Sequence, residues 1–194
     1  MDINTPIEIT ENSTGLDLLN ETRRAFSVYF WQEMQKVHSI PVVDDKQARM
    51  LSQHLGQRLG VMRVLTIIGD DEISQATDHL HRMFNADEEL AAIVFAPVND
   101  SIYSQYSANE MLFLWNTILQ QFFTRCLTAA AQQSNTDERT RLYAFAENAI
   151  SCCSALHMMK PDEITKALEI LKEFRAGNTN VSTKYTNVDM PDLT

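Results

Sequence analysis

The chain has 194 residues, of which 44% are hydrophobic, and this is enough to bury the core of one ordinary domain. Its formal net charge is −10, which argues against a dedicated DNA or RNA reader, because such proteins use lysine and arginine to neutralise phosphates. Glycine and proline number only five each, which argues against a fold of many short strands joined by turns.

Apolar residues recur at helical spacing along most of the chain and predict an all-α, single-domain bundle of about seven helices. The first helix is expected to begin after a cap at Ser13 or Thr14 and to end at His38. The second begins at a capping-box pattern that starts with Asp44, and Gly69 should close it as the residue after its last turn.

Two further helices are predicted before the middle of the chain. Asp70 or Asp71 should cap the third helix. Asn85 should begin the fourth, which passes through Val94 and stops before Pro97, because a residue preceding proline disfavours helical geometry.

The second half of the chain gives the clearest helix signals. Ser107 and Glu110 have the capping-box spacing and open a fifth helix to about residue 133. Its apolar arc is the widest, so we expect a central core helix, and polar residues interrupt it too often for a membrane span. Asp137 begins the sixth helix, which should end at about Met158. Pro161 begins the seventh, and Gly177 closes it.

The two ends of the chain are polar and lack helical period. We therefore expect flexible segments at 1–13 and 178–194 on either side of a helical domain at 14–177. One alternative stays open, because residues 7–9 and 181–185 both alternate in polarity and could pair as a small ribbon.

Cysteine usage favours a reducing compartment. Cys126, Cys152 and Cys153 are an odd count without framework spacing, and all three fall in apolar helical stretches. The first residues carry no basic region, so no secretory signal is expected and a cytoplasmic location is predicted.

The second predicted helix contains two glycines one turn apart, Gly56 and Gly60, which would let another backbone approach closely. Packing within the chain explains such a pair, and so does a subunit interface. In the second case, neighbouring bases would meet the acid-rich stretch 70–110 of a second copy and give a homodimer. These bases are Arg49, Arg58 and Arg63.

Two weaker patterns resemble chemical sites. Asp78 and His81 share a helix face, but a single pair of this kind is expected to be a solvated surface and not a metal site. Cys153 and His157 are four apart, as in cysteine nucleophiles, but Cys153 lies on an apolar stripe and is expected to be inert. We therefore expect no catalytic residue, metal or cofactor.

These patterns predict a non-enzymatic, acidic, helical interaction or regulatory protein that binds another protein through an exposed helix face, with no direct nucleic-acid or membrane contact. One alternative is a helical domain, sensor or enzyme, that binds a small apolar or aromatic ligand. Another is an acidic protein that blocks a basic nucleic-acid-binding surface. The three hypotheses predict different features. An exposed apolar patch would favour the interaction protein, an enclosed pocket the ligand-binding domain, and a single ridge of acids the protein that blocks a basic surface.

Overall fold

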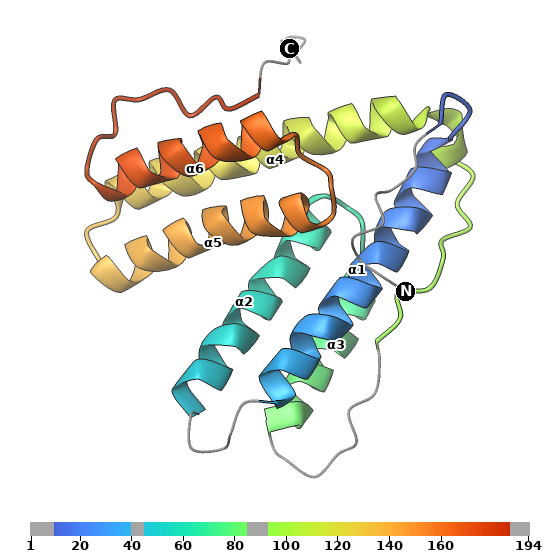
Figure 1. The fold of residues 1–194 in the computed structure, drawn as a ribbon, viewed down its shortest axis with the longest axis horizontal. Coiled ribbons are helices and arrows are strands. Elements are labelled where there is room, and N and C mark those ends of the chain that lie inside the picture. The colour runs from blue at the N-terminus through green and yellow to red at the C-terminus, as the bar shows by residue number, and fades with distance from the viewer. Residues whose placement is uncertain (1–9, 40–44, 85–92, 187–194) are drawn as a thin grey trace. The chain divides into compact units, whose positions relative to one another are not determined.

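The computed structural model describes residues 10–39, 45–84 and 93–186 (Figure 1). Within these ranges the chain forms six α-helices and one short 3₁₀ helix, with no strand, so the predicted all-α class is confirmed. None of these helices combines the length and apolar character that a bilayer span requires. The elements are α1 (Gly15–His38), α2 (Asp45–Val64), α3 (Asp70–Phe84), η2 (Tyr103–Gln105), α4 (Ala108–Gln132), α5 (Thr136–Ala155) and α6 (Pro161–Arg175).

The chain divides into two compact units, residues 1–111 and 112–194, and the boundary falls within α4. In the first unit α1 packs against α2, and α2 packs against α3. In the second unit α5 and α6 form an antiparallel hairpin, which Figure 1 shows in orange and red. The single domain expected over 14–177 stays a prediction.

The cap predicted at Ser13 or Thr14 lies at Thr14 and is a complete capping box, and the box predicted at Ser107 is also present, whereas Asp44, which should begin a third box, lies outside the described residues. Asp17 N–H donates to the Thr14 hydroxyl at 3.2 Å, and Thr14 N–H donates to the Asp17 carboxylate at 2.8 Å. Ser107 and Glu110 repeat this arrangement at the start of α4, at 2.8 and 3.2 Å. Each box satisfies backbone donors that the first helical turn leaves without a partner.

The two capped helix starts lie directly beside each other. Thr14 and Ser107 form an isolated antiparallel bridge, in which Gly15 N–H donates to the Tyr106 carbonyl at 2.7 Å. A β-carbon on Gly15 would lie 2.7 Å from the Tyr103 carbonyl oxygen. Glycine is therefore required here because two backbones approach closely.

The end of α2 differs from the prediction. The helix ends at Val64, and Thr66 takes the left-handed conformation with φ 60°. Ile67 N–H then donates to the Met62 carbonyl at 2.8 Å, which is the hydrogen bond of a Schellman cap. The prediction that Gly69 closes α2 was wrong: Gly69 immediately precedes α3 instead, and its N–H donates to the Glu72 carboxylate at 2.9 Å.

The last two helices end in the same manner. His157 after α5 has φ 55°, and Gly177 after α6 has φ 90°. The role predicted for Gly177 is confirmed, whereas α5 ends at Ala155, three residues earlier than expected at Met158. A glycine is visible in the sequence as a helix stop, but a histidine in the same conformation is not.

Most of the fourth predicted helix, residues 85–92, lies outside the described residues. Its expected continuation through Val94 is wrong, because residues 93–100 form no helix. This stretch is nevertheless packed, since Phe95 is only 4% exposed.

The chain beyond α6 also packs in part. Gln120 on α4 accepts a hydrogen bond from Tyr185 N–H at 3.0 Å and donates to the Thr183 carbonyl at 2.9 Å. Tyr185 is 2% exposed, and its ring meets Phe123 edge-on. The alternating pattern at 181–185 thus corresponds to side chains that alternate between α4 and solvent. The rest of the expected flexible segments, residues 1–9 and 187–194, lies outside the described residues.

Candidate functional site

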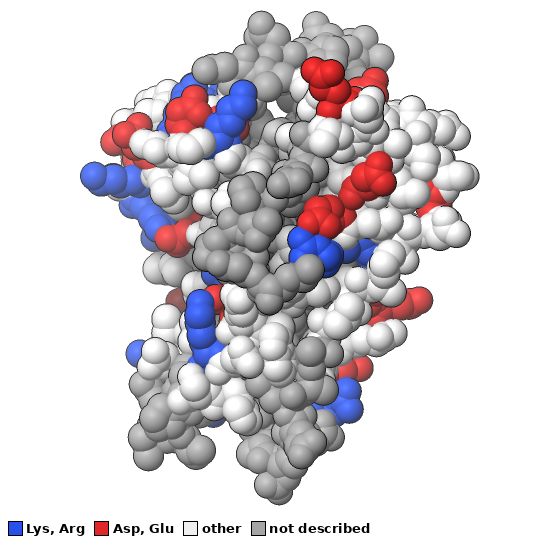
Figure 2. All heavy atoms as spheres, turned by 45° about the vertical axis from the view of Figure 1, so that its right-hand side comes forward, with Lys and Arg blue, Asp and Glu red and all other residues white. Residues whose placement is uncertain are grey.

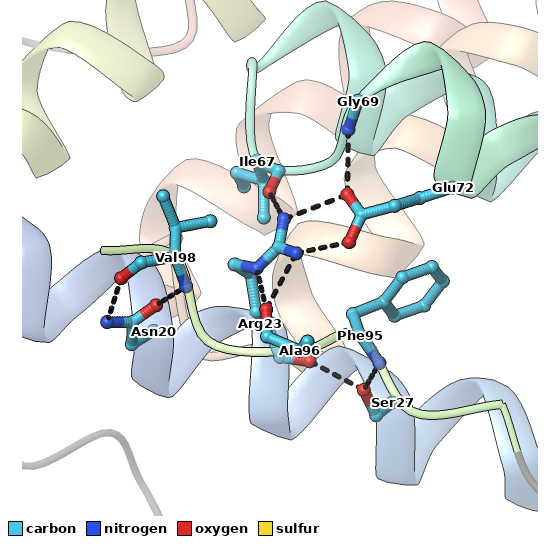
Figure 3. A network of polar contacts seen from close by, with 9 residues as sticks. All are labelled: Asn20, Arg23, Ser27, Ile67, Gly69, Glu72, Phe95, Ala96 and Val98. Atoms are coloured by element: carbon cyan, nitrogen blue, oxygen red, sulfur yellow. Dashed lines mark hydrogen bonds and ion pairs between the residues drawn. The ribbon is translucent and has the colours of Figure 1, made fainter. Parts of the chain in front are cut away.

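One face of α1 carries three polar side chains that bind a segment far away in the sequence (Figure 3). Asn20, Arg23 and Ser27 are three and four positions apart, which places them on one side of the helix. Asn20 donates to the Val98 carbonyl at 3.0 Å and accepts from Val98 N–H at 2.7 Å. We call residues 93–106 the anchored segment, because these side chains fix its backbone.

Arg23 lies at the centre of this network (Figure 3), and it is 4% exposed. Its guanidinium donates to the Ala96 carbonyl at 2.8 and 2.9 Å and to the Ile67 carbonyl at 2.6 Å. It also forms a two-pronged ion pair with Glu72, whose side chain is 29% exposed. Arg23 therefore joins α1, the turn after α2, the start of α3 and the anchored segment.

Ser27 and Phe95 complete the attachment. The Ser27 hydroxyl accepts from Phe95 N–H at 2.8 Å and donates to the Arg23 carbonyl at 3.0 Å. The Phe95 ring stacks on Phe26 with centroids 5.5 Å apart. The irregular backbone thus has polar partners and one buried aromatic residue, which is what a packed non-helical segment needs.

The same segment exposes large apolar side chains. Val94 is 73% exposed, Ile102 is 53% exposed and Tyr106 is 48% exposed. Ile102 N–H donates to the Asp100 carboxylate at 3.0 Å, which fixes the turn before η2. These side chains are therefore displayed by a backbone that is held at both ends, near Phe95 and at Tyr106.

A groove of about 550 Å³ lies beside the anchored segment in the first unit. Its apolar lining includes Leu19, Ile67, Ile68, Val98 and Tyr103. Its charged lining consists of Arg23, Arg63, Asp70, Glu72 and Asp100. The strained Thr66 also borders it. Backbone strain of this kind is concentrated at functional sites in proteins.

Net charge is unevenly divided between the two units. Residues 1–111 contain seventeen acidic and eight basic residues, a balance of −9, whereas residues 112–194 contain nine and eight, a balance of −1. At least five of the eight bases in the first unit form ion pairs within it. On the face shown in Figure 2, the described acidic and basic side chains are interspersed and form no ridge of one sign.

The sequence-predicted interface on α2 is only partly available to a partner. Gly56 is exposed, and a β-carbon there would meet no atom of the described residues within 4 Å, so no described part of the chain packs on this glycine. Gly60 is half-buried. The Arg58 guanidinium lies 5.1 Å above the Tyr29 ring and 3.0 Å from the Glu33 carboxylate. Its charge is therefore paired with α1 of the same chain. Homodimerisation through α2 stays a prediction.

The other two bases of that predicted interface are exposed. Arg63 forms an ion pair with Asp70 at 2.6 Å, with both side chains more than half exposed. Arg49 is exposed near the start of α2. An exposed pair such as Arg63 with Asp70 is worth little in water and can rearrange when a partner binds.

The weaker chemical patterns do not assemble. Asp78 and His81 are exposed on α3, and the described ranges contain no group of three potential metal ligands. Burial, and secondarily Cys152, raises the pKa of the Cys153 thiol well above its usual range. A protonated thiol with no exposed surface is not a nucleophile, and His157 lies exposed in the turn after α5.

Sequence reasoning missed the network around Arg23, although one signal was present. Arg23 occupies a position in the apolar stripe of α1 between Leu19 and Phe26, and a base at an inward position usually requires a buried partner. The identity of that partner is not encoded locally, since Glu72 and Ala96 lie 49 and 73 positions away.

Comparison with known proteins yields no relative. No protein-family model, no curated protein and no solved structure matches the chain.

Proposed function

We propose that the chain is a non-enzymatic interaction protein whose first unit binds a basic partner protein through the anchored segment. The observation that carries this proposal is the combination of a fixed backbone with exposed Val94, Ile102 and Tyr106. A recognition surface that is already ordered loses less conformational entropy when it binds. Tyrosine is also enriched among the residues that dominate binding energy in protein interfaces.

Charge supports a partner with a basic surface. The balance of −9 in the first unit would speed encounter with a positively charged protein and reject acidic ones. Nucleic-acid-binding proteins have such basic surfaces, so a partner of this kind is included in the proposal. A cytoplasmic location, which the three free cysteines favour, is part of the same proposal.

The groove gives less support to a small apolar ligand. Five charged residues contribute to its lining, whereas pockets for apolar molecules are lined mainly by hydrophobic side chains. A protein partner that presents both apolar and basic groups fits this lining better.

The test compares two double variants of the full chain as immobilised bait. Ile102→Ser with Tyr106→Ser removes apolar side chains of the anchored segment. Leu114→Ser with Leu168→Ser removes two side chains of similar exposure, 45% and 43%, from α4 and α6. Proteins captured from a lysate of the source organism are quantified by mass spectrometry and confirmed with the purified partner.

We expect at least about a tenfold loss of the same captured proteins with the first variant, the effect of removing one interface hot spot, and retention with the second. Circular dichroism confirms that both variants keep their helix content. Equal loss with the two variants, or capture that neither variant changes, would contradict the proposal.

A further inference from the structure

We propose that the groove beside the anchored segment receives an arginine side chain of the partner. This inference rests on the proposed function and assigns the groove a ligand chemistry. It follows from the sign of the unpaired charge in the groove, from its lining and from its volume.

Among the charged residues that line the groove, one carboxylate forms no ion pair with a described residue. Of its two bases, Arg23 is paired with Glu72, and Arg63 is paired with Asp70. The remaining charged residue is Asp100, which has no ion-pair partner among the described residues and uses one oxygen to accept from Ile102 N–H. Its second oxygen is therefore suited to accept a hydrogen bond from a cation.

An anion is disfavoured at the same place. The start of α3 borders the groove, and a helix N-terminus would ordinarily attract an anion. Here the first turn carries Asp70, Asp71 and Glu72, and the Glu72 carboxylate already accepts from Gly69 N–H. Carboxylates of the chain itself therefore already compensate the positive end of the helix dipole, and a further negative charge would be repelled.

The lining fits an arginine better than a simple ion. Tyr103 is half-buried in the groove wall, and a guanidinium can stack on an aromatic ring while it donates to a carboxylate. Val98, which is half-buried in the groove wall, offers apolar surface for the methylene stem. The volume of about 550 Å³ exceeds one side chain, and it falls within the range of about 300–1,000 Å³ typical of ligand pockets.

The test uses a capped tripeptide with arginine between two leucines, and a twin in which neutral citrulline replaces the arginine. Both are titrated into the full-length ¹⁵N-labelled chain, and amide shifts of Ile68, Gly69, Val98 and Ile102 are followed. The titration is repeated with Asp100→Asn, which keeps the oxygen that accepts from Ile102. The matched control is Asp78→Asn, which changes net charge equally at an exposed site on α3 outside the groove.

We expect saturable binding of the arginine peptide, with shifts at these four amides and at least about tenfold weaker binding of the citrulline twin. Asp100→Asn should weaken the arginine peptide by about tenfold, and Asp78→Asn by less than about twofold, because salt screens the distant charge. Equal binding of the two peptides, equal effects of the two variants, or shifts confined to other amides would overturn the inference.

The two proposals fail separately. If the arginine peptide does not bind, but the partner is still lost on substitution of Ile102 and Tyr106, the groove is wrong and the interaction surface stands. If the peptide binds as described, but the partner is unaffected by those substitutions, the groove stands and the anchored segment is not the main interface.

Discussion

The Asn20 side chain holds both backbone polar groups of Val98, a residue 78 positions further along the chain. It donates to the Val98 carbonyl at 3.0 Å and accepts from Val98 N–H at 2.7 Å. One amide therefore does for this residue what a neighbouring strand does in a sheet. Both groups are otherwise left at the edge of an irregular segment without a helix or strand to bind them.

Replacement of Asn20 by aspartate is expected to loosen the anchored segment. A carboxylate still accepts from Val98 N–H, but it cannot donate to the carbonyl and would repel it. We expect a loss of about 1–3 kcal/mol in the free energy of unfolding, measured with urea, and faster amide exchange at Val98. Asn12→Asp, at an exposed asparagine, is the control with the same charge change. A loss that the two variants share would reflect charge alone.

Arg23→Met should be far more damaging than Glu72→Gln. Loss of the guanidinium leaves the carbonyls of Ile67 and Ala96 and the Glu72 carboxylate without their partner, at a cost of about 3 kcal/mol or more. Glutamine at position 72 still accepts from Arg23, so we expect a cost of about 1–2 kcal/mol. Urea unfolding of both variants measures the difference. Equal losses would show that the ion pair alone holds this region together.

Acid should weaken the first unit through Glu33. Burial by itself raises the pKa of this carboxyl, but Lys36 and Arg58 outweigh it and bring the pKa below its ordinary value of 4.5. A carboxyl whose pKa is lower in the folded chain stabilises it above the unfolded pKa, and this contribution disappears as pH falls through the folded pKa.

Glu33→Gln should therefore lower stability near neutral pH and reduce its decline in acid. The difference in unfolding free energy between the native chain and this variant should be constant above about pH 5 and should shrink below it. Denaturant titrations between pH 7 and pH 3 measure this. A difference that stays constant throughout would show that the carboxylate charge is not what Arg58 and Lys36 stabilise.

The cap after α2 should accept glycine. Thr66 has φ 60°, which costs a β-branched residue roughly 1–2 kcal/mol. Allowing for the greater chain entropy of glycine, Thr66→Gly should stabilise by about 0.5–1 kcal/mol.

Gly177→Ala is the reverse experiment, because φ is 90° and no atom of the described residues within 4 Å would obstruct the new β-carbon. It should destabilise by about 1 kcal/mol in thermal unfolding. Effects of the same sign would contradict this account.

Tyr185 should matter for its ring and not for its hydroxyl. The hydroxyl is buried with no hydrogen-bond partner among the described residues, and burial, followed by Cys153 and Glu163, raises the pKa of the phenol. Tyr185→Phe should be neutral or stabilise by up to about 1 kcal/mol, whereas Tyr185→Ala should cost about 3–5 kcal/mol. Calorimetry compares them. A clear loss with phenylalanine would indicate that the hydroxyl has a partner.

The sequence predicts those parts of the fold that are encoded locally. The boxes at Thr14 and Ser107 require only residues three positions apart, and Gly177 is a helix stop by its own chemistry. The end of α2 is different. Its left-handed residue is Thr66 because Ile67 and Ile68 are buried immediately afterwards, and that burial outweighs the local preference of Gly69 for the same conformation.

The candidate site could not be predicted for a related reason. Only the first residues of the anchored segment, up to Val94, continue an apolar pattern of helical spacing, and the partners that bind the backbone after them are side chains about 70 positions earlier. Periodicity reports the face that a residue buries and not the group that binds its backbone. The bases on α2 could be identified in the sequence, but the ion pair of Arg58 with Glu33 and its contact with the Tyr29 ring could not be predicted from it.

The way in which α1 holds the anchored segment has a consequence for how such a surface can change. Within the anchored segment, Asn20, Arg23 and Ser27 bind only main-chain atoms, and every residue type except proline supplies both the carbonyl and the N–H that such contacts use. Apart from Phe95 and Asp100, the side chains displayed between 94 and 102 therefore take no part in the hydrogen bonds that order the segment. New residues at Val94 or Ile102 would alter what is recognised while the shape that presents them persists, which makes the segment a natural place to graft or evolve a different specificity.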